Sequence, residues 1–292
     1  MKQIMKPTVI DFFDKDSNTF SYIVIDPSSK ACAIIDPVYD FDYPSGTLSH
    51  QHADAMIRYI REHQLVLEWI IETHVHADHI SSAAYIQQEL GGKIAIGEHV
   101  ISVQEIFAKV YNESSDFTRD GSQFDHLFKE NEVYKIGHLE AKAMHTPGHT
   151  PACMTHVIGD CAFVGDTIFR PDQGTARADF PSGSAAELFD SIQKIFALPD
   201  DTRLYMCHDY SPEKPHLAFE SSVADEKANN IHVHSGIEKI EYIEIRKTRD
   251  ETLGMPKYIL PAIQINMRAG KLPTAEKNGL AYLKIPVNAF KN

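Results

Sequence analysis

Three histidines and one aspartate lie within six residues, at His74, His76, Asp78 and His79. The apolar run at 67–71 predicts a strand that ends just before them. Side chains at positions i and i+2 of an extended segment point the same way, so His74 and His76 can bind one metal ion. Asp78 and His79 can then face a second site about 3.5–4 Å away, a typical two-metal separation. Without a metal, these groups would lose solvation and repel one another.

Three later residues fit the same chemistry. His149 lies in the turn of sequence His-Thr-Pro-Gly-His-Thr, Asp166 follows the end of a predicted strand, and His208 ends another. Taken singly, each is a turn histidine, a strand-end carboxylate or a buried histidine. Their order after the first motif favours a single metal centre, in which the carboxylate of Asp166 could bridge two ions.

Strands and helices alternate along the part of the chain that must position these residues. Strands are expected at 21–26, 31–35, 67–71, 93–96, 133–136, 140–144, 154–158, 161–164 and 204–207. Helices are expected at 54–63, 80–90 and 184–196, and the polar stretch 112–131 is expected to be a loop. This pattern predicts an α+β fold, with two mixed sheets packed face to face and helices outside (αββα).

The pattern changes after residue 215. Residues 1–215 are expected to form the catalytic domain, and 216–292 an extension packed on the same domain. Within the extension, Ser235 and Glu238 predict a capping box that opens a helix toward Arg249. A proline-interrupted tail without regular structure is expected beyond that helix.

Composition excludes several classes of function. The chain has 292 residues, 43% of them hydrophobic, and a net charge of −13, which disfavours nucleic acids and anionic membranes as partners. No run approaches the ~18 apolar residues that a membrane span needs. The first eleven residues lack the apolar core of a secretory signal, so we expect a cytoplasmic protein. None of the four cysteines forms a C-x-x-C pair, so buried free thiols are expected.

The order and types of these residues resemble the metallo-β-lactamase superfamily over roughly residues 18–210. The resemblance implies a metallo-β-lactamase sandwich with a C-terminal extension. In a two-metal interpretation, Asp166 bridges two ions and the other ligands form two sets: His74, His76 and His149, and Asp78, His79 and His208. Two Zn(II) ions would then lower the pKa of a bridging water and make a hydrolase.

A one-metal interpretation needs only His74, His149 and Asp166. Two histidines and one carboxylate are the ligand set of non-haem Fe(II) oxygenases. The stretch after Asp166, with Gly174, Arg177 and Asp179 in the order Gly-x-x-Arg-x-Asp-Phe, is similar to the persulfide dioxygenases. The segments 266–273 and 283–286 resemble the longer bacterial branch of that group, whose members are often named β-lactamase-like hydrolases.

That resemblance implies oxidation of glutathione persulfide by O2, giving sulfite and glutathione at one Fe(II) per chain. His76, Asp78, His79 and His208 would then orient ligands and water. Arg177, Asp179 and Tyr210 are the candidate catalytic or substrate-contacting residues, although the spacing around Arg177 differs from the shorter dioxygenases. Candidate partners for the substrate carboxylates are Arg246, Arg249, Arg268 and Lys271. The resemblance also implies a homodimer.

Other functions are weighed against this one. A dinuclear zinc hydrolase, either a glyoxalase II-like thioester hydrolase or a lactonase, uses the same seven ligands. The 174–180 element favours the dioxygenase, as does the absence of a clear helical tail after His208. A non-catalytic binding module is disfavoured because the ligand set is complete, and a nuclease because the net charge is negative.

Overall fold

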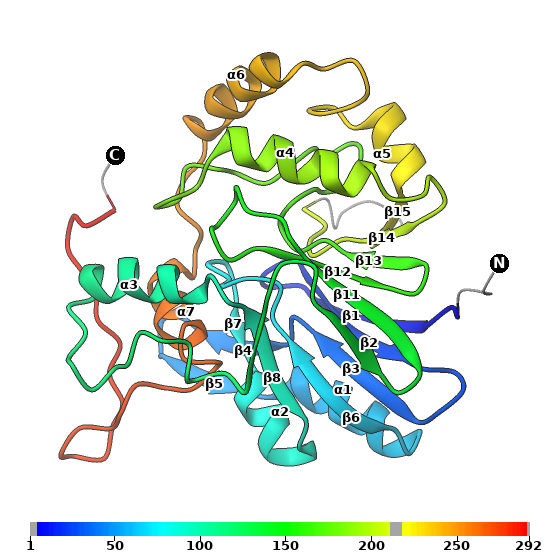
Figure 1. Ribbon diagram of the computed structural model, residues 1–292. Coiled ribbons are helices and arrows are strands. Elements are labelled where there is room, and N and C mark those ends of the chain that lie inside the picture. Colours follow the sequence, from blue (N-terminus) through cyan, green and yellow to red (C-terminus); the bar gives the residue numbers. More distant parts are fainter. Residues whose placement is uncertain (1–4, 211–217, 291–292) are drawn as a thin grey trace.

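Two six-stranded sheets pack face to face with helices on their outer sides in the computed structural model, which describes residues 5–210 and 218–290 (Figure 1). The predicted αββα arrangement is confirmed. The first sheet has the order β1 (Thr8–Asp14), β2 (Thr19–Ile25), β3 (Ala31–Ile35), β6 (Val66–Ile71), β8 (Lys93–Gly97) and β9 (His126–Phe128). The second has the order β10 (Val133–Ile136), β11 (Leu139–His145), β12 (Met154–Ile158), β13 (Cys161–Phe163), β14 (Arg203–Tyr205) and β15 (Glu220–Ser222). A small third sheet joins β5 (Thr47–Ser49), β4 (Val38–Asp42) and β7 (Ile80–Ser81).

Strand direction brings the functional segments to one edge of the sandwich. β3 and β6 are parallel with Ile35 opposite Ile71, so the residues that follow both strands leave the sheet together. β13 and β14 are also parallel, which brings the segments after them to a common edge. The Phe20 N–H donates to the Cys207 carbonyl at 2.7 Å and ties the second edge to the first sheet.

Helices complete the four layers. On the outer face of the first sheet, the apolar core includes residues of α1 (Gln51–Glu62), α2 (Ala83–Leu90), α3 (Val100–Val110) and α7 (Ile259–Asn266). α4 (Ala185–Phe196), α5 (Val223–Asn229) and α6 (Lys239–Asp250) lie on the side of the second sheet (Figure 1). α4 forms as its sequence predicts, because Ser184 caps its N-terminus and Leu188, Ile192 and Ile195 bury one face.

Two local predictions in the first half of the chain are wrong. The helix expected over 80–90 begins only at Ala83, because Ile80–Ser81 pairs with β4 as the short strand β7. The stretch 112–131 is not all loop, since its residues 126–128 form β9 beside β8. A three-residue edge strand carries too little periodicity to be recognised from sequence.

The extension also differs from expectation. The helix predicted to open at Ser235 starts at Lys239, and Glu238 makes no capping side-chain bond. The tail contains α7, whose Pro261 lies in the first turn, where its missing N–H has no helical partner to lose. Among residues 218–290 there are thus three helices, so the lack of a helical tail no longer distinguishes the dioxygenase from a glyoxalase II-like enzyme.

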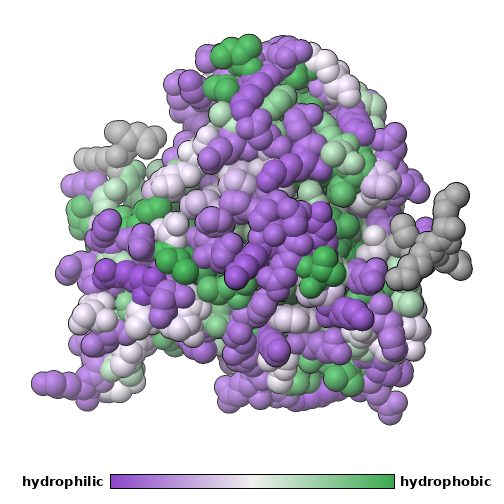
Figure 2. Space-filling view, viewed as in Figure 1, coloured by the Kyte–Doolittle hydropathy of each residue, from purple (hydrophilic) through white to green (hydrophobic). Residues whose placement is uncertain are grey.

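The expected domain boundary at 215/216 lies outside the described residues. Within 5–210 and 218–290, no helix is long and apolar enough to cross a bilayer. The four cysteines are buried and unpaired, as expected. Figure 2 shows a face on which hydrophilic residues predominate and hydrophobic ones form small separate groups.

Candidate metal centre

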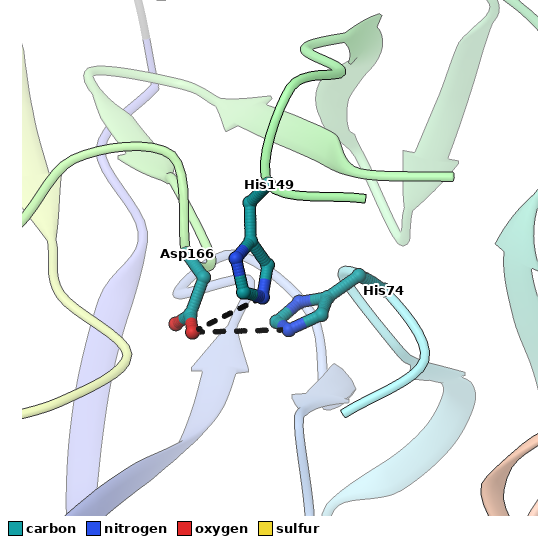
Figure 3. A group of neighbouring side chains, drawn as sticks. All are labelled: His74, His149 and Asp166. Carbon is teal, nitrogen blue, oxygen red and sulfur yellow. Dashed lines mark ion pairs between the residues drawn. The ribbon is translucent and has the colours of Figure 1, made fainter. Parts of the chain in front are cut away.

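His74, His149 and Asp166 converge from three separate segments (Figure 3). His74 follows β6, His149 lies in the turn between β11 and β12, and Asp166 follows β13. The Asp166 Oδ2 atom is 3.9 Å from His74 Nε2 and 3.6 Å from His149 Nε2. These separations are too long for hydrogen bonds, but two metal–ligand bonds of about 2.1 Å can span them. The geometry therefore suits one shared cation.

A second group of donors lies beside the first. His76, Asp78 and His79 each offer a ligand atom within 4.8 Å of the others. The Nε2 atom of His208 is 3.1 Å from Asp78 Oδ2 and 3.2 Å from Asp166 Oδ1, so this histidine links the two groups. All seven residues that the sequence analysis selected thus lie together, and they offer donors for either one ion or two.

The ring nitrogens of the buried histidines show how well the residues fit a cation. His74 Nδ1 donates to Thr73 Oγ1 at 3.0 Å, and His208 Nδ1 donates to the Asn18 carbonyl at 3.2 Å. Among the described residues, His74 Nε2, His76 Nδ1 and His79 Nε2 have no hydrogen-bond partner. His208 Nε2 lies at ion-pair distance from Asp78 Oδ2 and Asp166 Oδ1 but without hydrogen-bond geometry. Buried polar atoms are rarely left unpaired. Histidines that bind metals commonly anchor one nitrogen and present the other, so these residues fit a metal ion.

The electrostatics of the cluster point the same way. Burial, with the nearby His76, lowers the pKa of His74 well below 6.5, so this imidazole is neutral. Burial opposes a charge on His208, but Asp78 and Asp166 outweigh it and raise the pKa of His208 to about 9. The carboxylates thus hold a positive charge between them. A divalent cation can take that place and displace the proton.

Two acidic residues absent from the sequence-based site complete its support. His76 Nε2 donates to Asp36 Oδ1 at 2.9 Å and lies 3.5 Å from Glu72 Oε2. Asp36 also accepts from the Thr73 N–H at 2.7 Å. This bond fixes the start of the ligand loop, the segment between β6 and β7 that carries His74, His76, Asp78 and His79. Asp36 directly follows β3, as Asp166 follows β13. Its position at the end of a strand was the sequence signal that could have identified Asp36 as part of the site.

The centre opens into a pocket of about 840 Å³. Asp78, His149 and Asp166 line this pocket. Its walls come from the segment 169–180 and from the extension, between Ile231 and Tyr258. A volume of this size accommodates a ligand as large as a tripeptide thiol.

Comparison with protein families matches residues 15–208 to the metallo-beta-lactamase superfamily. This chain belongs to that superfamily. Its members are metal-dependent enzymes, which agrees with the unpaired donors described above. Among solved structures, ETHE1 from Myxococcus xanthus is similar with a TM-score of 0.71 and 26% identity, covering 90% of this chain and 100% of that one.

Relatives carry names of two enzyme types. The "Probable metallo-hydrolase" of Burkholderia pseudomallei is 48% identical, over 97% of this chain and 100% of its own. "Glyoxylase B2" of Dictyostelium discoideum is 46% identical over 96% and 97%. The human mitochondrial "Persulfide dioxygenase ETHE1" is 31% identical over 90% and 89%. The chain spans 66% of the length of the "Beta-lactamase hydrolase-like protein" of Xylella fastidiosa, to which it is 48% identical.

Arg177 and Asp179, which were expected to contact substrate, bond mainly to each other and to the backbone. Arg177 forms a two-bond ion pair with Asp179 at 2.6 and 2.7 Å and donates to the Gly254 carbonyl at 2.6 Å. Its own carbonyl accepts from His149 Nδ1 at 2.8 Å. Arg177 therefore orients His149, a candidate ligand, through its backbone carbonyl. Tyr210 lines the pocket and stacks on His208, with ring centroids 5.1 Å apart.

The four basic candidates of the extension take different positions. Arg246 is not a solvated surface charge, because it is 2% exposed, pairs with Asp250 at 2.8 Å and donates to the Thr175 carbonyl at 2.7 Å. Arg268 pairs with Glu113 at 2.7 Å, and neither it nor Lys271 lines the pocket. Arg249 lines the pocket and is exposed. Arg249 is thus the one of the four that is placed and accessible for a ligand.

Proposed function

We propose that this chain is a persulfide dioxygenase with one Fe(II), held by His74, His149 and Asp166. The observation that carries the proposal is the convergence of this two-histidine, one-carboxylate set, of which His149 and Asp166 line a large pocket. The similarity to the human persulfide dioxygenase over most of both chains supports it. The proposed substrates are glutathione persulfide, O2 and one water; the products are glutathione, sulfite and two protons.

The chain's own residues have defined tasks in this reaction. When bound, Fe(II) would supply the redox chemistry that lets O2 oxidise the terminal sulfur. Asp36 and the Arg177 carbonyl fix the ring orientation of His76 and His149 through hydrogen bonds of 2.9 and 2.8 Å. Tyr210 and Phe169, with ring centroids 5.5 Å apart, line the pocket beside His208.

A second candidate is a dinuclear zinc hydrolase acting on a thioester or a lactone. The specific observation in its favour is the second donor group, His76, Asp78 and His79, which also converges. The 46% identity to a protein named glyoxylase supports it as well. In this alternative Asp166 would contact both ions, and the hydrolytic nucleophile would be a metal-activated water.

Metal content and oxygen uptake, measured together, test the proposal. The protein is purified anaerobically, its iron and zinc are counted, and glutathione persulfide is added in an oxygen-electrode cell. We expect about one iron per chain and persulfide-dependent O2 consumption, abolished by an iron chelator and restored by Fe(II) but not by Zn(II). Two zinc ions per chain without O2 uptake would contradict the dioxygenase, and thioester hydrolysis would then be assayed. Sedimentation of the same sample tests the expected homodimer.

Arg249 is proposed to bind a carboxylate of the substrate. In the variant Arg249→Ala we expect KM for glutathione persulfide to rise about tenfold with kcat little changed, because an exposed charge-assisted hydrogen bond contributes roughly 1–2 kcal/mol. Lys247→Ala is the matched control, since Lys247 is exposed on the same helix and does not line the pocket. An equal change of KM in both variants would show only a general loss of positive charge.

A further inference from the structure

Asn266, at the end of α7, is buried against the loop that carries four of the candidate metal ligands. Its Nδ2 atom donates to the His76 carbonyl at 2.9 Å and to the His79 carbonyl at 2.8 Å. Its Oδ1 atom accepts from the Ser81 N–H at 2.8 Å. One side chain from the extension therefore spans both the middle and the end of the ligand loop.

These three bonds define the orientation of the amide. The two N–H groups of Asn266 face two carbonyls, and its oxygen faces an N–H, so a flipped amide would set like groups against each other. The loop between β6 and β7 cannot satisfy these carbonyls by strand or helix pairing. Because a buried carbonyl without a donor is unfavourable, the amide selects this loop conformation.

Contacts of the residues after Asn266 hold its backbone in place. The Met267 carbonyl accepts from Gln104 Nε2 at 2.9 Å. Gly270, with a φ of +80°, lies so close to the start of α2 that a Cβ there would be 2.8 Å from the Ser81 carbonyl oxygen. The backbone of segment 266–270 therefore packs closely against the end of the ligand loop.

We propose that Asn266 is a positioning residue of the metal centre, which sets the spacing between His76 and His79 by clamping their carbonyls. The inference rests on the proposed metal centre. With two ions, His76 and His79 are themselves ligands; with one ion, the clamp acts on the loop that also carries the ligand His74. Ligand geometry must be held closely for tight metal binding. Loss of the clamp is therefore expected to weaken metal binding even though Asn266 touches no ligand side chain.

The test compares two buried amides on the same helix. Gln264 also makes three amide hydrogen bonds, donating to the Leu260 and Lys284 carbonyls and accepting from the Lys284 N–H, but it contacts the tail and not the ligand loop. In Asn266→Asp and Gln264→Glu, a carboxylate oxygen replaces the donor in each case. Co(II) alone is titrated into the metal-free proteins against a chelator, and its absorption spectrum is recorded.

For Asn266→Asp we expect the Co(II) dissociation constant to rise about tenfold to a hundredfold, with a changed ligand-field spectrum. For Gln264→Glu we expect a value within about twofold of the wild type, with a similar loss of thermal stability in the metal-free protein. Equal weakening in both variants would mean that α7 has loosened as a whole and would overturn the inference. If Asn266→Asp does not fold, Asn266→Ala and Gln264→Ala replace the pair, with the same expectations.

The proposed metal centre and the proposed clamp can fail separately in this experiment. Absence of Co(II) binding by the wild-type protein would overturn both. Tight Co(II) binding by the wild type, together with equally tight binding by Asn266→Asp, would overturn only the role of Asn266.

Discussion

Replacing His149 by alanine is expected to reduce persulfide-dependent O2 uptake by about a thousandfold or more while the protein stays folded. His149 Nε2 is 3.6 Å from Asp166 Oδ2, and His149 lines the pocket. Its removal leaves one histidine and one carboxylate in the proposed iron site. Loss of metal-based stabilisation worth several kcal/mol corresponds to at least this fall in rate. The measurement is O2 uptake with metal content and circular dichroism on the same sample.

His63→Ala is the control for this experiment, because His63 is exposed at the C-terminal end of α1, where its ring bonds to the Tyr59 carbonyl, and it does not line the pocket. It should retain the wild-type rate and metal content. Unchanged activity in His149→Ala would contradict the dioxygenase and the zinc hydrolase alike, since both interpretations use this ligand.

Gly148→Ala is expected to destabilise the protein by about 3 kcal/mol or more and to impair metal binding. Gly148 has a φ of +134°, and a Cβ there would lie 2.3 Å from the backbone nitrogen of Leu188. The Gly148 carbonyl also accepts from the Ser184 N–H at 2.8 Å, so the turn is packed directly on the start of α4. A shift of the Gly148 backbone away from the start of α4 would also move the neighbouring His149. Urea unfolding of the metal-free protein and a Co(II) titration measure the two effects.

Gly46→Ala separates backbone strain from steric overlap. Gly46 also has a positive φ, +66°, but nothing lies within 4 Å of the position of its Cβ. The expected loss is about 1 kcal/mol, with metal binding unchanged. If both variants lost the same stability, contact with α4 would not be the cause at Gly148.

The extension emerges as a structural part of the site. Three side chains on one face of α6 bind the segment that orients His149: Tyr242 bonds to Thr175 Oγ1 at 2.9 Å, Arg246 to the Thr175 carbonyl, and Asp250 to the Ala178 N–H at 3.0 Å. Asn266 on α7 does the same for the loop of His76 and His79. Residues beyond 218 therefore brace both the segment that orients His149 and the loop that carries His76 and His79.

The sequence by itself determined the layered fold and selected the candidate donor residues that the fold brings together. The seven candidate ligands are residues with few structural uses in such an order, and strand and helix periodicities are local properties of the chain. Short elements such as β7 and β9 were missed because two or three residues carry no periodic signal, and their pairing depends on distant strands. α7 was missed because its proline suggested a break, although a first turn tolerates one.

Only the tertiary structure decided which polar residues support the donors. Asp36 meets His76 because β3 and β6 are parallel neighbours, and nothing near either residue in sequence reveals that pairing. From sequence, Asn266 is an ordinary polar residue and Arg246 a candidate partner for substrate carboxylates. The fold buries both, and because a buried polar group must find partners, both bond to the backbone of the site. Contacts between residues up to 190 positions apart arise from packing, which no local pattern encodes.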